Sequence, residues 1–132
     1  MIKPIMKSEF FLRLPSEDAG PDDAATGQDL LDTLNEHEHE CVGLAANMIG
    51  VRKRIICVKD GNRALLMYNP QILEQVNAYQ TSEGCLSLIG ERPCTRYRRI
   101  KVEYLDENFV RRIKNFSGYT AEIIQHEIDH CN

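Results

Sequence analysis

The sequence predicts an α+β fold, in which antiparallel strands pack around a central C-terminal helix and another helix lies near the N-terminus. Two observations support this fold class. Apolar residues recur at helical spacing near both ends of the chain, in residues 23–39 and again after Gly118. Between these segments, short apolar or alternating runs are separated by turn-forming sequences such as Asp60-Gly61-Asn62.

The N-terminal half is expected to contain one helix followed by a β-hairpin. The helix should run over about residues 23–39, with Gly27 as a weak point near its start. Residues 41–51 are rich in small side chains, which indicates a loop or extended segment that another part of the chain approaches closely. Residues 54–60 should then form a buried strand, which turns into a second strand over residues 63–70.

The second half is expected to add strands and the final helix. Pro70 should break the chain before a further strand at residues 71–80, since proline cannot donate a backbone hydrogen bond to a sheet. Residues 100–104 alternate between apolar and charged side chains, which is typical of a strand with one wet face, and residues 109–116 return after a turn. A basic run in this region either faces solvent or contacts a ligand; it comprises Arg92, Arg96, Arg98, Arg99 and Lys101.

Length and composition limit the classes of protein that fit. The 132 residues are expected to form one domain, residues 1–132, with a single core. The net charge of −4 argues against a specific nucleic-acid partner. No run approaches the roughly 20 apolar residues that cross a bilayer, so we expect no membrane association. The five cysteines show no paired spacing, which favours a reducing compartment, and we expect a cytoplasmic protein.

The final helix carries the pattern His-Glu-x-x-His. Successive helix residues turn by about 100° around the axis, so residues four apart project from the same side. The predicted helix therefore has one ionisable face (Ile123, His126, Glu127 and His130) and one apolar face (Ala121, Ile124 and Ile128). A helix with this division should be packed on both sides, and its histidines should face an interior cleft.

Two histidines at this spacing can bind one metal ion, while the glutamate beside them is better placed to handle a proton. Only Cys131 and Asn132 follow His130, and Cys131 is turned away from the shared face, so a third ligand is expected upstream. The upstream candidates are His37, His39, Cys41, Cys57, Cys85 and Cys94. The surroundings of Cys85 favour it, because Gly84 permits close approach and strand-like segments flank it. A Cys-His-His set leaves a position open for water, as in catalytic metal sites.

Three motifs occur in an order that resembles the peptide deformylase family. They are Val-Gly-Leu-Ala-Ala-Asn-Met-Ile-Gly at residues 42–50, Glu-Gly-Cys-Leu-Ser at 83–87 and Gln-His-Glu-Ile-Asp-His at 125–130. The resemblance covers most of the chain. It implies a metal-dependent hydrolase that removes the N-formyl group from N-formylmethionyl peptides of nascent proteins. Formylmethionyl peptides would be the substrates, and the ribosome exit region would be a partner.

The resemblance also implies the roles of individual residues. Cys85, His126 and His130 would bind one divalent metal ion, Fe²⁺ in the cell, with Zn²⁺, Ni²⁺ and Co²⁺ as alternatives that suit the same ligands. Metal-bound water would be the nucleophile, and Glu127 would act as general acid and base. The backbone N–H of Leu86 would donate to the developing oxyanion. Further expected substrate contacts are Gly43, Met48 and Ile123.

Three positions depart from the family pattern. Met48 stands where the family usually has a glutamine that donates to the oxyanion, and a thioether cannot donate a hydrogen bond. Losing one such donor typically lowers the rate by about 10²–10³. The neighbouring Asn47 would point the opposite way in an extended segment and could not substitute. Ile89 replaces a usual proline, and Cys41 replaces a common glycine.

Two alternatives to an active deformylase therefore stay open. The first is a catalytically weak or inactive relative that binds peptide N-termini or senses a metal, a role for which Met48 would be no handicap. The second is a structural metal site closed by a fourth ligand, either Cys94 or Cys131. A closed sulfur-rich site would leave no position for water and would exclude hydrolysis.

Overall fold

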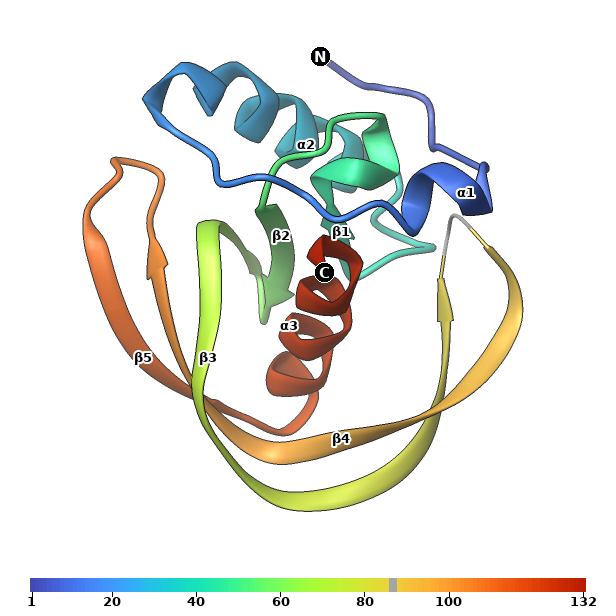
Figure 1. Ribbon diagram of the computed structural model, residues 1–132, viewed down its shortest axis with the longest axis vertical. Coiled ribbons are helices and arrows are strands. Elements are labelled where there is room, and N and C mark those ends of the chain that lie inside the picture. The colour runs from blue at the N-terminus through green and yellow to red at the C-terminus, as the bar shows by residue number, and fades with distance from the viewer. Residues whose placement is uncertain (86–87) are drawn as a thin grey trace.

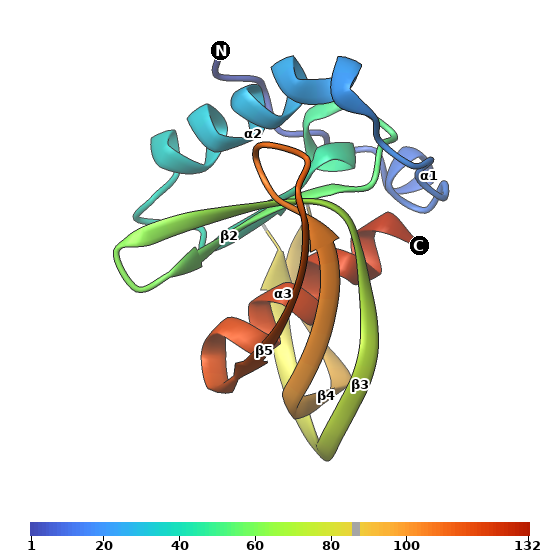
Figure 2. The ribbon, with the colours of Figure 1, turned by 90° about the vertical axis from the view of Figure 1, so that its left-hand side faces the viewer.

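The protein is described here by a computed structural model, which covers residues 1–85 and 88–132. One helix, α3 (Gly118–Cys131), lies at the centre of the molecule, and a strongly curved antiparallel sheet wraps around it (Figure 1). A second helix, α2 (Ala24–Glu36), lies along the upper side of the sheet (Figure 2). The predicted α+β fold with a central C-terminal helix is confirmed.

The sheet has five strands in the order β1-β2-β3-β4-β5, and each strand is antiparallel to its neighbours. The strands are β1 (Gly43–Ala45), β2 (Ile55–Asp60), β3 (Arg63–Cys85), β4 (Leu88–Leu105) and β5 (Arg111–Ser117). A short helix α1 (Glu9–Leu12) and two 3₁₀ turns, η1 (Pro21–Asp23) and η2 (Ala46–Ile49), complete the secondary structure. The hairpin predicted around Gly61 is the β2–β3 hairpin, in which Asp60 pairs with Arg63.

The two long strands β3 and β4 give the sheet its shape. Together they form a curved ribbon that passes beneath α3 and rises again on its other side (Figure 1). The register of β3 against β4 shifts between Tyr68 and Gln71 and again between Ile72 and Glu74. Such bulges bend a strand and increase its twist. The curvature brings the end of β3 to the cleft that β1 and α3 also line.

The predicted chain break at Pro70 is wrong. Strand β3 continues through Pro70, which lies within the first register shift, where no ladder hydrogen bond is required of it. Asn69 adopts the left-handed backbone conformation with φ of 52°. Its side-chain amide exchanges two hydrogen bonds with the backbone of Ala19, at 2.7 and 2.9 Å. The bulge thus fastens the N-terminal segment to the sheet.

The α2 helix is shorter than predicted, because it begins after η1 and ends at Glu36. Gly27, which we expected to be a weak point, is required by packing. A Cβ atom built at Gly27 would lie 2.1 Å from the hydroxyl oxygen of Tyr68. Tyr68 is buried and stacks on Phe109 with ring centroids 4.2 Å apart, so it has little room to move. The glycine lets α2 lie directly on the sheet.

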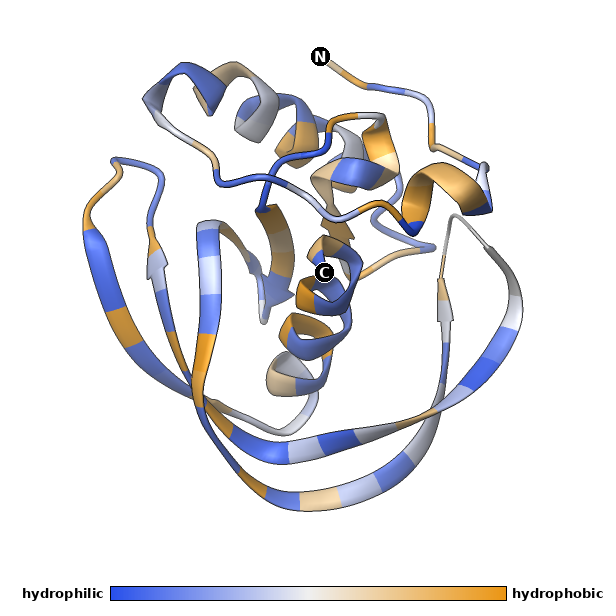
Figure 3. Ribbon diagram, in the orientation of Figure 1, coloured by the Kyte–Doolittle hydropathy of each residue, from blue (hydrophilic) through white to orange (hydrophobic). Residues whose placement is uncertain are grey.

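The hydrophobic core lies between α2, α3 and the inner face of β2, β3 and β4. The far bends of β3 and β4 are largely hydrophilic, whereas β2 is mostly hydrophobic (Figure 3). The predicted apolar face of the last helix is confirmed, because Ala121, Ile124 and Ile128 are all buried. Within the described residues, no helix has both the length and the apolar character needed to cross a membrane.

Candidate active and metal-binding site

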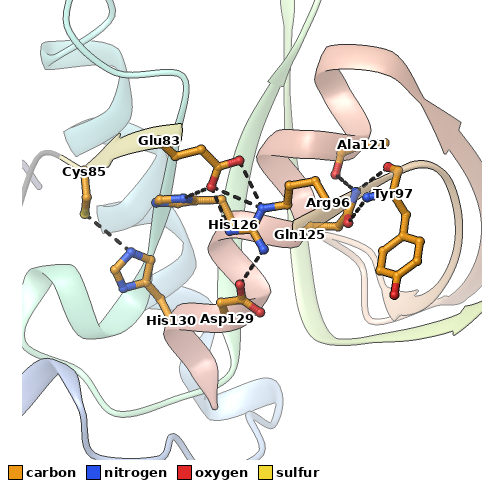
Figure 4. Close-up of polar contacts among 9 residues, drawn as sticks. All are labelled: Glu83, Cys85, Arg96, Tyr97, Ala121, Gln125, His126, Asp129 and His130. Atoms are coloured by element: carbon orange, nitrogen blue, oxygen red, sulfur yellow. Dashed lines mark hydrogen bonds and ion pairs between the residues drawn. The ribbon is translucent and has the colours of Figure 1, made fainter. Parts of the chain in front are cut away.

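Three ionisable side chains meet where the end of β3 lies beside α3. Cys85 is the last residue of β3, and His126 and His130 are one turn apart on α3. The Cys85 Sγ atom lies 3.4 Å from His130 Nε2, and the ligand atoms of all three residues lie within 4.8 Å of one another (Figure 4). In tetrahedral zinc-type sites, a sulfur ligand and a nitrogen ligand of the same ion lie roughly 3.5 Å apart. The distance between Cys85 Sγ and His130 Nε2 therefore fits two ligands of one ion.

A glutamine fixes α3 against β4. Strand β5 pairs with β4 only from Arg99 onwards, so the edge of β4 at Tyr97 is open. The Gln125 side chain covers this edge, accepting from the Tyr97 N–H and donating to the Tyr97 carbonyl, both at 2.8 Å. Gln125 is buried, and its amide also donates to Ala121. This contact holds the helix in register with the strand that carries Arg96.

A buried ion-pair network orients the first histidine. Arg96 binds Glu83 through two parallel hydrogen bonds of 2.7 and 3.0 Å, and it also binds Asp129 at 2.6 Å. Glu83 in turn lies 2.7 Å from Nδ1 of His126 (Figure 4). Because Nδ1 is engaged, Nε2 of His126 is the atom left to face a metal ion.

Sequence reasoning did not assign roles to Glu83, Arg96, Gln125 or Asp129. The sequence does not decide whether the basic run of residues 92–101 faces solvent or a ligand, and the structure assigns its members to different places. Arg96 is buried in the site, while Arg92, Arg98 and Arg99 are exposed. Two spacings were available as signals. Glu83 lies two residues before Cys85 on a strand, and Asp129 lies three residues after His126 on a helix, and both spacings place side chains on a shared face.

The network also sets the charge states of its members. Burial raises the pKa of Glu83, but hydrogen bonds from Arg96, Glu122 and His126 outweigh burial and lower this pKa to about 2. Burial lowers the pKa of His126, yet Cys85, Glu127 and Glu83 outweigh it and raise this pKa to about 9. A position surrounded by so much negative charge attracts a cation, whether a proton or a metal ion.

Glu127 lies beside the cluster and is almost completely buried, with 4% of its surface exposed. Burial raises its pKa to about 6, although the two histidines oppose this shift. The Oε1 atom of Glu127 has no hydrogen-bond partner among the described residues. A buried acceptor without a partner costs free energy unless water or a ligand reaches it. This orphaned oxygen therefore points to a small molecule bound beside the cluster.

A cleft of about 610 Å³ opens onto this cluster. One wall is the loop after α2 and strand β1, the other is formed by the end of β3 and the start of β4, and α3 forms the floor. The expected substrate contacts Gly43, Met48 and Ile123 all line this cleft. The expected oxyanion donor, Leu86, and the side chain of Ile89 lie outside the described residues.

Gly43 is required for β1 to lie against the helix. A Cβ atom built on Gly43 would lie 2.7 Å from Ile123 Cγ2 and 2.9 Å from Glu127 Oε2. Any side chain here would push β1 away from α3 or displace the Glu127 carboxylate. The sequence predicted a close backbone approach at this segment, and the structure identifies the helix as the approaching element.

Two of the residues that depart from the family pattern contact the open edge of β1. Within the described residues 1–85 and 88–132, β1 pairs with β2 alone, and its other edge faces the cleft. The Cys41 thiol donates to the Gly43 carbonyl at 2.8 Å, and the Ala45 N–H donates to the Met48 thioether at 3.4 Å. Met48 is thus turned towards its own strand.

Asn47 does not lie in an extended segment, because residues 46–49 form η2. Its amide nevertheless points away from the cleft and donates to the carbonyl of His130 at 2.6 Å, near the end of α3. Late helix carbonyls lack intrahelical partners, and Asn47 provides one. Asn47 therefore does not replace the donor missing at Met48.

The remaining cysteines do not join the three-residue cluster among the described residues. Cys131 and Cys57 are buried, and burial raises the pKa of each thiol to about 12, so both stay protonated. The Cys131 thiol donates to the backbone of Glu127. Cys94 is partly exposed and lines a small cavity of about 130 Å³ that Cys85, His126 and His130 also line. The site as described offers three protein ligands.

The donor set fits a divalent transition-metal ion. One thiolate and two imidazoles suit iron, zinc, nickel or cobalt better than magnesium or calcium. The spacing of the three ligand atoms, the engaged Nδ1 of His126 and the unpartnered oxygen of Glu127 agree with an ion that keeps one coordination position for a non-protein ligand.

Comparison with known proteins agrees with this geometry. A family model described as polypeptide deformylase matches residues 6–132. The chain belongs to the polypeptide deformylase family. It is 52% identical over 130 residues to the peptide deformylase of Clostridium beijerinckii. This match covers 98% of this chain and 96% of that relative. It is 39% identical over 106 residues to peptide deformylase 1 of Clostridium perfringens, covering 78% of this chain and 71% of that protein.

Solved deformylase structures have the same fold. The peptide deformylase of Thermotoga maritima superposes with a TM-score of 0.90 at 28% identity, covering 100% of this chain and 92% of that chain. A class I type b peptide deformylase from Acinetobacter baumannii with Met-Ala-Ser bound gives a TM-score of 0.89 at 28% identity, covering 100% and 95%. These relatives identify the present protein as an enzyme of this class and do not favour a non-catalytic role.

Replacing Arg96 with methionine tests the role of the network in this deformylase. The variant leaves Glu83 buried beside His126 without its counter-ion, so the imidazole loses its fixed orientation. Loss of such outer contacts typically weakens metal binding by about 10–100-fold. Chelator competition with Zn²⁺ would measure this loss.

Arg99→Met is the matched control, because Arg99 is exposed on the same strand. It should retain the metal affinity of the parent protein. Equal affinities for both folded variants would show that Arg96 does not orient the site.

Proposed function

We propose that this protein hydrolyses the N-formyl group of N-formylmethionyl peptides, with Cys85, His126 and His130 as metal ligands and Glu127 as general acid and base. The observation that carries the proposal is the buried Glu127 carboxylate, which lies beside the three-residue cluster and has an oxygen without a protein partner. Both features open onto one cleft that is large enough for a peptide N-terminus.

A divalent metal ion bound by the three residues would act as a Lewis acid and make a water molecule acidic enough to provide hydroxide near neutral pH. We propose Fe²⁺ as the ion in the cell, with Zn²⁺, Ni²⁺ or Co²⁺ as substitutes that the same ligands accept. The Glu83–Arg96 pair holds His126 in the orientation that presents Nε2 to this ion.

Glu127 is suited to exchange protons during the reaction. Burial raises its pKa to about 6, close to the range in which a group can both accept and return a proton at cellular pH. In our proposal the carboxylate accepts the proton of the attacking water and then donates it to the leaving amine. Its position next to Gly43 puts it at the edge of β1, where the substrate would lie.

The substrate would extend along the open edge of β1, beside Gly43. Ile123 and Met48 give the cleft apolar surface for the methionine side chain. The Acinetobacter baumannii relative with bound Met-Ala-Ser supports a peptide as the substrate. Formylated N-termini arise on new proteins, so we propose that the enzyme acts in the cytoplasm, near the ribosome exit region.

The developing oxyanion would receive one hydrogen bond from the backbone of Leu86. Met48 adds no donor, and its sulfur already accepts from Ala45. In addition, the Cys41 thiol donates to the Gly43 carbonyl. A substrate backbone that binds this carbonyl would need to displace the thiol. These contacts support a working but slow deformylase.

Replacing Glu127 with glutamine should lower formate release by at least about 10²-fold, since general acid–base groups typically contribute 10²–10⁴. The measurement is formate production from a formyl-Met tripeptide by protein loaded with Fe²⁺ under anaerobic conditions. The variant should still bind the metal, and an unformylated peptide should give no formate. Turnover equal to that of the parent protein would exclude Glu127 as the acid and base.

Replacing Met48 with glutamine should raise kcat, because the amide adds a donor that is worth up to about 10²–10³ in rate. Met48→Leu is the control, since leucine has similar volume and is equally unable to donate. Steady-state kinetics of both variants on the same peptide would distinguish the effect of the added donor from the effect of changing the side chain. A gain in kcat with leucine as well, or no gain with glutamine, would mean that the oxyanion is stabilised by other groups.

A further inference from the structure

The two histidines of the cluster are held in different ways. His126 is fixed through its ring, because Glu83 engages its Nδ1 atom at 2.7 Å. The ring of His130 faces Cys85 through Nε2 at 3.4 Å, and no hydrogen bond holds its Nδ1 atom among the residues that the structure describes. Metal-binding histidines usually have their second ring nitrogen engaged, which fixes the ring. The position of the His130 ring therefore depends more strongly on its backbone.

The backbone of His130 lies in the last turn of α3, next to η2. Asn47 lies on η2 and is buried, with 1% of its surface exposed. Its side-chain nitrogen donates to the carbonyl of His130 at 2.6 Å and to that of Leu12 at 3.4 Å. The next carbonyl of the helix, that of Cys131, accepts from the backbone N–H of Ser16 at 3.0 Å. The end of α3 is thus held by groups that lie outside the helix.

The orientation of the Asn47 amide follows from these neighbours. Both of its partners are carbonyl oxygens, which only accept, so the side-chain nitrogen must face them. The Oδ1 atom then has no hydrogen-bond partner among the described residues. A buried acceptor without a partner costs free energy. A role of the donor at the end of α3 explains this cost better than core packing does.

We propose that Asn47 is a positioning residue for the metal site, because it holds the last turn of α3 so that the His130 ring stays aligned with Cys85 and His126. This inference rests on the proposed function, in which His130 is a metal ligand. Glu83 fixes one histidine through its ring, and Asn47 fixes the other through its main chain. A ring that moves with a loosened helix end releases a metal ion more easily, so the rate of metal release is the quantity that should change.

The test is the release of Co²⁺ from the loaded protein to an excess of chelator, followed by the absorption band that a thiolate ligand gives to bound cobalt. Asn47→Ala removes the donor and should release Co²⁺ about tenfold faster, as is typical when a contact that orients a metal ligand is lost. Its cobalt spectrum should also shift, because the ligand geometry changes. Release at the parent rate would overturn the inference. Faster release with an unchanged spectrum would indicate general loosening of the fold and would overturn it as well.

Asp106→Ala is the matched control. Asp106 is also a buried polar side chain that binds two backbone groups, since it accepts from the N–H groups of Asn108 and Val110 at 2.9 and 3.0 Å. It lies in the turn between β4 and β5 and lines neither cavity that the metal ligands line. This variant should lose stability and keep the cobalt spectrum and the release rate of the parent protein. Equally fast release from both variants would show that the effect is not specific to Asn47.

Asn47→Leu keeps the test decisive if the alanine variant does not fold. Leucine has the branched shape of asparagine and cannot donate a hydrogen bond. It should therefore release Co²⁺ about tenfold faster than the parent protein, and release at the parent rate would exclude the hydrogen bond to His130 as a positioning contact. A parent protein that binds no Co²⁺ would refute the proposed function itself, whereas a parent that binds it with unaffected variants refutes only this inference.

Discussion

The site depends on one buried ion pair, that between Arg96 and Glu83. Both side chains are about nine-tenths buried, and burying either charge alone would be costly. The guanidinium of Arg96 donates two parallel hydrogen bonds to the Glu83 carboxylate. Each of the two side chains also forms a further hydrogen bond with a residue of α3. Glu83 accepts from His126 and Arg96 donates to Asp129, so the pair joins the sheet to the helix that carries the motif.

This ion pair, which joins β3 to the neighbouring β4, reaches α3 because the sheet is bent. Cys85 and Glu83 lie at the far end of a strand of 23 residues, and a flat strand of that length would carry them away from the helix. The register shifts in the first half of β3 provide the curvature, and Gln125 fastens the helix to β4 at Tyr97. On the opposite side, Gly43 lets β1 approach α3 closely. Bent strands and a glycine therefore enclose the same helix face from two directions.

Much of this arrangement could be predicted from local sequence patterns. The alternating strands and the two faces of α3 follow from periodicity, and the hairpin at Gly61 follows from its turn-forming residues. Both signals depend on neighbouring residues only. The continuity of β3 could not be predicted, since Pro70 signals a break unless a bulge accommodates it. The partners of Arg96 could not be predicted either. Its pairing with Glu83 and Asp129 depends on how the strands and the helix meet in space.

The central claim is that one thiolate and two imidazoles hold a metal ion and leave a position open. X-ray absorption spectroscopy at the metal edge, on protein loaded with Zn²⁺ or Co²⁺, tests it most directly. The account predicts one sulfur and two imidazole nitrogens, completed by an oxygen ligand from solvent, with the sulfur lost in Cys85→Ser. Two sulfur ligands, or a sulfur that persists in Cys85→Ser, would show that Cys94 or Cys131 closes the site and would contradict the account.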